Sequence, residues 1–251
     1  MKALRTALFF VFLIAAWAFV AQRQIWDSTL FPSPAKVAGT LADLGRDGTL
    51  LNATIVSLRR VCLGYAISLG IGLPLGALLA QVAWIEDTVG ALVSAFQTLP
   101  SICWLPLALL WFGLNDRAIL FVIVMGSLVS IAMAVKDGVR HLPPSYLRAA
   151  RTMGTSPLRT YTEVLIPASQ PALLTAAKLG WSYAWRALMS GELLFVSLGL
   201  GHILMMGREL ADMSQVLAVM IVIMALGLGA EHLFFRPLET HVRQRWGFAT
   251  S

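Results

Sequence analysis

The sequence predicts an all-α integral membrane protein with about six transmembrane helices. Hydrophobic residues make up 58% of its 251 residues and charged residues only 13%, whereas soluble domains carry roughly 25% charged residues. The apolar residues form blocks close to the roughly 20 residues that cross a hydrocarbon core. Eight tryptophans are typical of side chains at the interface between membrane and water. We place the spans at residues 7–21, 50–80, 89–112, 118–135, 179–200 and 216–235, inside one transmembrane domain over residues 1–251.

The first span, residues 7–21, follows Lys2 and Arg5 and has two interpretations. It is either a retained helix or a cleaved signal, because Ala16-Trp17-Ala18 resembles a signal-peptidase site. Cleavage would leave five spans and would not change the topology of the rest. The polar stretch that follows contains Pro32 and Pro34, and after them residues 35–44 are predicted to form a short amphipathic helix.

The next two spans have features that indicate close packing and a break. Four glycines lie in the second span, and small residues let membrane helices approach closely. These glycines are Gly64, Gly70, Gly72 and Gly76. Pro100 and Pro106 interrupt the third span. Broken helices occur at membrane depth only where they are buried in protein or line a cavity.

A basic insert over residues 136–178 separates the fourth and fifth spans. A short helix is predicted over residues 146–153, with Gly154 as its C-terminal stop. A second helix is predicted to open at Ser156-Pro157 and to end at Pro167. Lys and Arg are more frequent on the side of the amino terminus, which predicts that both termini and this insert lie in the cytoplasm.

The insert resembles the EAA loop of ABC-importer permeases, whose pattern is E-A-A-x3-G-x9-I-x-L-P. The spacing agrees throughout, with Arg148 in place of the usual Glu, which puts in doubt any salt bridge that Glu makes in relatives. The resemblance implies the type I importer fold, with a coupling helix in residues 136–178 that docks on a separate ATPase subunit. It assigns the coupling role to Arg148, Ala149, Ala150, Gly154 and Pro167. An ordinary amphipathic connecting loop is the alternative.

Motifs elsewhere in the chain resemble the nitrate, sulfonate, taurine and bicarbonate branch of these permeases. They include Phe31-Pro32-Ser33-Pro34, Ser57-Leu58-Arg59-Arg60-Val61, Leu99-Pro100, Trp111-Phe112-Gly113 and Gly191-Glu192-Leu193-Leu194. The resemblance implies a second permease copy, a pair of ATPases that bind ATP and Mg, and a soluble external binding protein, all at a bacterial inner membrane. The implied cargo is a small oxyanion, and the alternative cargo is a heterocyclic nutrient or vitamin precursor.

Other functional classes are less well supported by the residues. The chain has no G-x-x-x-x-G-K-[ST] run, so we expect no ATP site of that type in it. The net charge is +6. The basic residues lie between apolar blocks, which favours membrane lipid over nucleic acid as a partner. We see neither catalytic residues nor a metal-ligand spacing, and a passive channel or an intramembrane receptor or enzyme remain alternatives.

Seven polar or aromatic side chains are candidates for the substrate path. They are Arg186, Glu192, Gln97, Ser101, Trp104, Arg59 and Arg60. Charges at membrane depth are costly, so Arg186 and Glu192 either line the path or form ion pairs that hold helices together. Helical steps of three and four group Gln97, Ser101 and Trp104, although Trp104 could equally be packing. Arg59 and Arg60 either meet an anion at the outer mouth or pair with Asp43 and Asp47.

Overall fold

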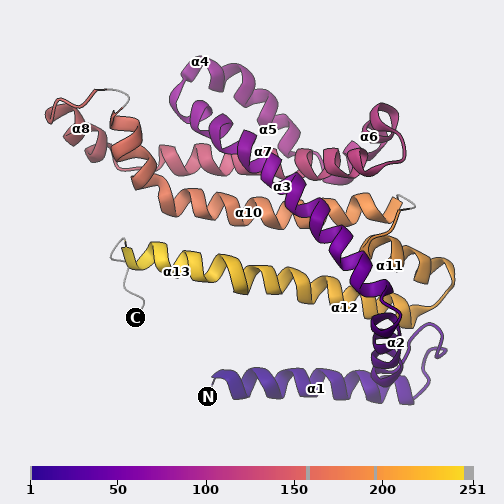
Figure 1. Cartoon of the computed structure of the whole chain (residues 1–251). Helices are drawn as coiled ribbons and strands as arrows, with labels where there is room; N and C mark the ends of the chain where they lie inside the picture. Colours follow the sequence, from indigo (N-terminus) through magenta and orange to yellow (C-terminus); the bar gives the residue numbers. More distant parts are fainter. Residues whose placement is uncertain (1, 157–158, 195–196, 246–251) are drawn as a thin grey trace. The chain divides into compact units, whose positions relative to one another are not determined.

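The computed structural model describes residues 2–156, 159–194 and 197–245, and every regular element in these ranges is a helix (Figure 1). The elements are α1 (Lys2–Gln22), α2 (Pro34–Arg46), α3 (Thr49–Gln81), α4 (Ala83–Ile85), η1 (Glu86–Gly90), α5 (Ala91–Gln97), η2 (Ser101–Trp104), α6 (Leu105–Phe112), α7 (Asp116–Arg140), α8 (Pro144–Thr152), η3 (Thr160–Leu165), α10 (Ile166–Leu194), α11 (Leu200–Glu209), α12 (Met213–Ala230), η4 (Glu231–Phe235) and α13 (Arg236–Arg245). The predicted all-α class is confirmed.

The chain forms two compact units. The first comprises Met1–Leu58 and Glu192–Leu226, and the second comprises Arg59–Gly191 and Gly227–Ser251. Helices α3, α10 and α12 contribute residues to both units. A single permease domain over residues 1–251 therefore stays a prediction.

Four helices of the described residues are long and apolar enough to cross a membrane, and a bent pair raises this number to five. The four are Leu4–Gln22, Thr49–Gln81, Asp116–Arg140 and Met213–Val242. They coincide with the predicted first, second, fourth and sixth spans. Most of the predicted fifth span, residues 179–194, lies in α10, and its residues 195 and 196 are outside the described ranges. Helix α10 carries Lys178, Arg186 and Glu192 and is not among these apolar helices. Six spans therefore stay a prediction.

In the first unit, the polar stretch after α1 leads into the predicted amphipathic helix. Helix α2 begins after Ser33, whose side chain accepts a hydrogen bond from the backbone N–H of Lys36 at 3.3 Å. Such an N-cap satisfies one of the free donors in the first turn. Val37 is buried, and Trp17 Nε1 of α1 donates to the carbonyl of Pro32 at 3.0 Å. The prediction of a short helix here is confirmed.

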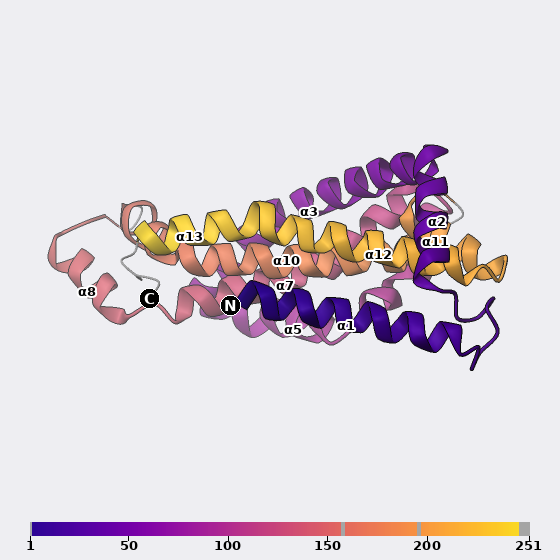
Figure 2. The ribbon, with the colours of Figure 1, turned by 90° about the horizontal axis from the view of Figure 1, so that it is seen from below.

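Helix α7 lies in the core of the second unit and packs beside α3 and α10, as the two views show (Figure 2). Ile131 and Val135 of α7 are fully buried. A Cβ on Gly76 of α3 would lie 2.4 Å from the backbone oxygen of Ala132 in α7. The predicted close approach through glycine is therefore present at Gly76, where a larger residue would collide with backbone.

The predicted break of the third span is a sharp bend. The two parts, Ala83–Gln97 and Ser101–Phe112, meet at an angle of 105°. Pro100 has extended backbone angles and begins the short helix η2, because proline is disfavoured inside a continuing helix. Gln97 and Ser101 consequently lie on different helices, so the helical steps that grouped them with Trp104 do not apply across the bend.

The insert is more helical than predicted. Helix α7 continues to Arg140, and α10 already begins at Ile166. Gly154 has φ +68° after α8, which confirms the predicted stop. The prediction that Pro167 ends a helix is wrong: it is the second residue of α10, which follows the π-helix η3 without a break. Residues 157 and 158, at the predicted start of the second helix, are outside the described ranges.

Candidate functional site

A cavity of about 290 Å³ in the second unit brings together three of the predicted path residues. Gln97 comes from the end of α5, Ser101 from the start of η2, and Arg186 from α10. Ser130 of α7 and Tyr183 of α10 also line it. The bend at Pro100 is therefore part of the cavity wall, as expected for a helix broken at membrane depth.

Arg186 supplies the positive charge of this cavity. Its Nε donates to the carbonyl of Ser182 at 3.0 Å, and its guanidinium lies 4.6 Å from the centre of the Tyr183 ring. Within the described part of the chain, no carboxylate forms an ion pair with Arg186. A guanidinium presents a planar set of donors that matches an oxyanion. The cavity therefore offers an anion a charge that no acid of the described chain neutralises.

A larger cavity of about 560 Å³ lies in the same unit between α10 and α13. Its cation, Lys178, is already paired, with Nζ 2.8 Å from Glu231 Oε1 and 3.8 Å from Glu239 Oε2. A neutralised cation attracts an anion weakly, so the smaller cavity beside Arg186 is the better candidate for a charged solute.

Trp104 has a packing role in the structure. Its ring makes edge contacts with Phe96 at 5.2 Å and with Phe121 at 6.3 Å between ring centres. It is not among the residues that line the cavity. This geometry agrees with the alternative in which Trp104 fills space beside the bend.

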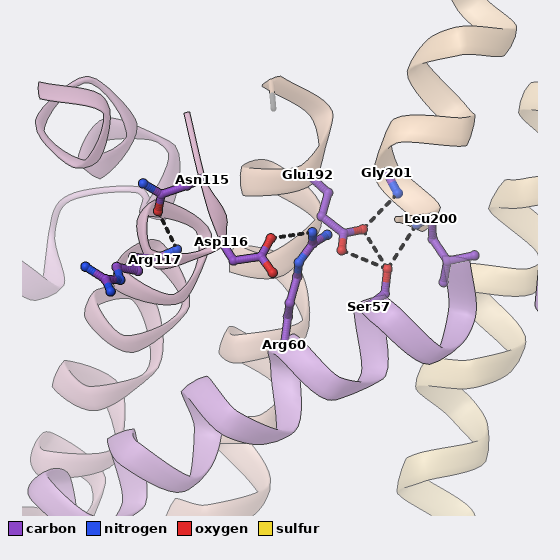
Figure 3. Close-up of polar contacts among 8 residues, drawn as sticks. All are labelled: Ser57, Arg60, Asn115, Asp116, Arg117, Glu192, Leu200 and Gly201. Atoms are coloured by element: carbon purple, nitrogen blue, oxygen red, sulfur yellow. Dashed lines mark hydrogen bonds and ion pairs between the residues drawn. The ribbon is translucent and has the colours of Figure 1, made fainter. Parts of the chain in front are cut away.

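The structure places Asp116, at the start of α7, beside Arg60 (Figure 3). Arg60 Nη2 lies 2.6 Å from Asp116 Oδ1, and the Arg60 side chain is almost completely buried. Asp43, which we considered as a partner, instead lies 3.6 Å from Arg46. Arg59 is exposed. The choice of partner depends on which helices meet, which local sequence does not reveal.

Glu192 is fully buried in the first unit and is held by a serine and a helix start. Ser57 Oγ donates toward both carboxylate oxygens, at 2.8 and 2.7 Å (Figure 3). The same Oγ accepts from the backbone N–H of Leu200 at 2.9 Å, and the Gly201 N–H donates to Glu192 Oε2 at 3.0 Å. This arrangement joins α3, α10 and the beginning of α11, and it agrees with the structural alternative for Glu192.

Of the predicted coupling residues, Arg148, Ala149 and Ala150 belong to α8, Gly154 follows it, and Pro167 lies in α10. Helix α8 lies beyond the N-terminal end of α10 in both views (Figures 1 and 2). Arg148 is exposed, whereas Ala150 is buried and its carbonyl accepts from the Thr155 N–H at 3.2 Å and the Thr155 hydroxyl at 2.9 Å. Ala149 belongs to α8, but its side chain is outside the described part. Helix α8 contains two arginines and no acid, and Arg148 contributes a positive charge to its exposed surface.

Sequence reasoning missed three polar residues that line the cavity: Thr98, Ser130 and Tyr183. Tyr183 precedes Arg186 by one helical step, so an i, i+3 search around the charged residue would have found it. Ser130 carries no such pattern, because many serines occur in the spans and only the packing of α7 shows which one faces a cavity.

The long apolar helices, the broken third span and the short helix α8 between α7 and α10 are the features of a transporter permease that the structure shows. The family described as binding-protein-dependent transport system inner membrane component matches residues 72–235. The chain belongs to this family. The resemblance drawn from the EAA-type spacing is thereby confirmed.

Curated relatives and a solved structure agree with this assignment. A chain named as an ABC transporter permease protein in Methanocaldococcus jannaschii is 33% identical over 72% of this chain and 68% of its own. The taurine transport system permease TauC of Escherichia coli is 26% identical over 91% of this chain and 86% of its own. A chain of the MetNI methionine ABC transporter shares the fold, with a TM-score of 0.68, 23% identity, and coverage of 80% and 97%.

The family assignment defines the class of activity. The chain is a multi-pass inner-membrane permease subunit of an ABC importer, and the ATPase is a separate chain. Its partners are that ATPase and a substrate-binding protein. The passive-channel and intramembrane-enzyme alternatives are replaced by this assignment.

Proposed function

We propose that this permease carries a small oxyanion: nitrate, a sulfonate such as taurine, or bicarbonate. The observation that carries the proposal is the Arg186 guanidinium in the cavity with Gln97 and Ser101, without an acidic partner among the described residues. A sulfonate or nitrate would accept hydrogen bonds from the guanidinium, and the amide and hydroxyl would satisfy its remaining oxygens. The similarity to a taurine permease supports the same chemistry.

The test is uptake of radiolabelled taurine, nitrate and bicarbonate into proteoliposomes that hold the permease, its ATPase and its binding protein. Arg186→Gln removes one charged hydrogen-bonding partner, which is worth about 1.5–3 kcal/mol, or about 10- to 150-fold in apparent affinity. Arg186→Lys keeps the charge but loses the planar donor fork, so we expect a partial loss. The matched control is Arg208→Gln, because Arg208 is exposed and donates a weak hydrogen bond to Met205 Sδ, at 3.6 Å.

Uptake that is equal in Arg186→Gln, Arg208→Gln and the unmodified protein would refute the oxyanion proposal. That result would favour a neutral cargo such as a heterocyclic nutrient, because a neutral solute does not need an unpaired guanidinium.

Assembly and orientation belong to the same proposal. Two copies of this chain would form the path along their interface, with lipid around them and both termini in the cytoplasm. The excess of Lys and Arg in the insert and tail supports this orientation. ATP and Mg would bind only on the partner ATPase. The mass of the detergent-purified complex tests the homodimer, since a complex with a single copy of this chain would contradict it.

We propose further that α8 docks on the ATPase through Arg148, Ala149, Ala150, Gly154 and the segment up to Pro167. Ala150 and Gly154 let α8 turn back closely on the chain that follows, and Arg148 remains exposed for a partner. Because α8 carries two arginines and no acid, the receiving groove of the ATPase should carry a carboxylate opposite Arg148.

A further inference from the structure

Three charged side chains form ion pairs at the C-terminal end of α7, the end that leads into α8. Glu86 of η1 forms a two-bond ion pair with Arg140, the last residue of α7. Lys136, one turn earlier on α7, places its Nζ 3.5 Å from Glu86 Oε1. Only three residues then separate Arg140 from Pro144, where α8 begins. The ion pair therefore lies at the root of the proposed docking helix.

This group is partly shielded from solvent. The side chains of Glu86, Lys136 and Arg140 are 24%, 13% and 42% exposed. A bidentate arginine–carboxylate pair holds a defined geometry, unlike most exposed ion pairs. With Lys136 as a second cation, the carboxylate of Glu86 joins η1 to α7 at two points.

Both helices joined by Glu86 continue to the cavity. Residues 83–97 form one helical stretch. Its part from Glu86 to Gln97 is about 16 Å long at 1.5 Å per residue. Helix α7 runs from Arg140 back to Ser130, about 15 Å by the same rise. Gln97 and Ser130 both line the cavity beside Arg186.

Apolar contacts between α5 and α7 lie nearer the cavity than the ion pair does, and Leu79 of α3 takes part in them. Leu79, Val93, Val129 and Ala132 form one buried cluster, against which Ile85, Phe96, Leu128 and Met133 pack. A rigid packed pair moves as a unit when one end is displaced. Motion applied at the α8 end would therefore reach the cavity through α7 and α5 together, provided that their ends stay joined.

We propose that Glu86 is a positioning residue for coupling: it ties the root of the α8 segment to η1–α5, so that movement of α8 shifts both cavity-lining helices. The inference rests on the proposed docking of α8, and it is independent of which solute is carried. Without Glu86, α7 would still move with α8, but η1 and α5 would follow it only through the apolar cluster.

The test compares Glu86→Gln, Arg140→Gln and the double variant in proteoliposomes, with Asp87→Asn as the control for loss of an exposed neighbouring charge in the same helix. The measurements are ATP hydrolysis, solute taken up per ATP, and co-purification of the ATPase. Mutations of coupling elements change coupling by about 0.5–2 kcal/mol, or about 2- to 30-fold. We expect uptake per ATP to fall by that factor in Glu86→Gln, while hydrolysis and co-purification persist.

Arg140→Gln should have a smaller effect, because Lys136 still reaches Glu86. The double variant should match Glu86→Gln, since two residues that act as a unit give non-additive losses. Additive losses, or uptake per ATP equal to that of Asp87→Asn, would overturn the proposal. Loss of co-purification in Glu86→Gln would also overturn it, because that places Glu86 in docking or folding. Failure of α8 docking itself is separate, and would appear as unchanged co-purification when Arg148 is reversed to Glu.

Discussion

Removal of the Ser57 hydroxyl should destabilise the first unit more than its size suggests. Ser57 Oγ donates to Glu192 and accepts from the Leu200 N–H, and both Ser57 and Glu192 are completely buried. Ser57→Ala therefore removes a hydrogen bond to a carboxylate, worth about 1.5–3 kcal/mol, and leaves a buried N–H without this partner, at about 1–3 kcal/mol. Because the two losses share one site and are not additive, we expect about 2–4 kcal/mol in total.

The assay is equilibrium unfolding of the purified permease in mixed micelles, because scanning midpoints of irreversible unfolding depend on rate. The matched control is Ser190→Ala, whose hydroxyl donates only to the carbonyl of Arg186 one turn earlier, at 3.1 Å. We expect that control to stay within about 0.5 kcal/mol of the unmodified protein. If Ser57→Ala were as stable as Ser190→Ala, the argument that Glu192 is held by this cluster would be refuted.

Two further predictions concern helix packing and docking. Gly76→Ala places a Cβ 2.4 Å from the Ala132 oxygen and should lower the free energy of unfolding by about 1–3 kcal/mol in the same assay. The control is Gly70→Ala, whose Cβ meets nothing within 4 Å and which should be neutral. Equal stabilities of the two variants would contradict the close α3–α7 contact. Arg148→Glu should abolish co-purification of the ATPase, because it sets a second carboxylate against the proposed carboxylate of the ATPase groove. The control, Arg159→Gln, should leave co-purification intact. Retention of the ATPase by Arg148→Glu would rule out an acidic groove.

Local features of the fold could be predicted from the sequence because their causes are local. Pro100 disrupts the helix that contains it, and the two parts of the third span indeed meet at 105°. Gly154 adopts a positive φ that favours glycine, and α8 ends just before it. Ser33 before a proline begins α2. In each case a single residue type determines the backbone, whatever packs against it.

Features that depend on tertiary contacts could not be predicted in this way. Pro167 could end a helix or lie inside one, and only the path of η3 and α10 distinguishes these. Arg60 has acids closer in sequence than Asp116, yet α3 and α7 meet at Asp116. Glu86 and Arg140 are 54 residues apart in the sequence, and neither has a pattern that marks it as part of a pair.

The cavity shows how two separate sequence clues can have one physical cause. Arg186 was a candidate because a charge in a span is costly, and Gln97 and Ser101 were candidates because they flank a broken helix. A lipid-facing surface can satisfy neither a guanidinium nor the free backbone groups of a break. Both need a polar cavity inside the protein, and a single cavity of about 290 Å³ contains all three side chains. Because polar groups are costly in a bilayer, these three side chains are expected to share one polar cavity, as they do. Their arrangement supports a path for a polar solute at this place.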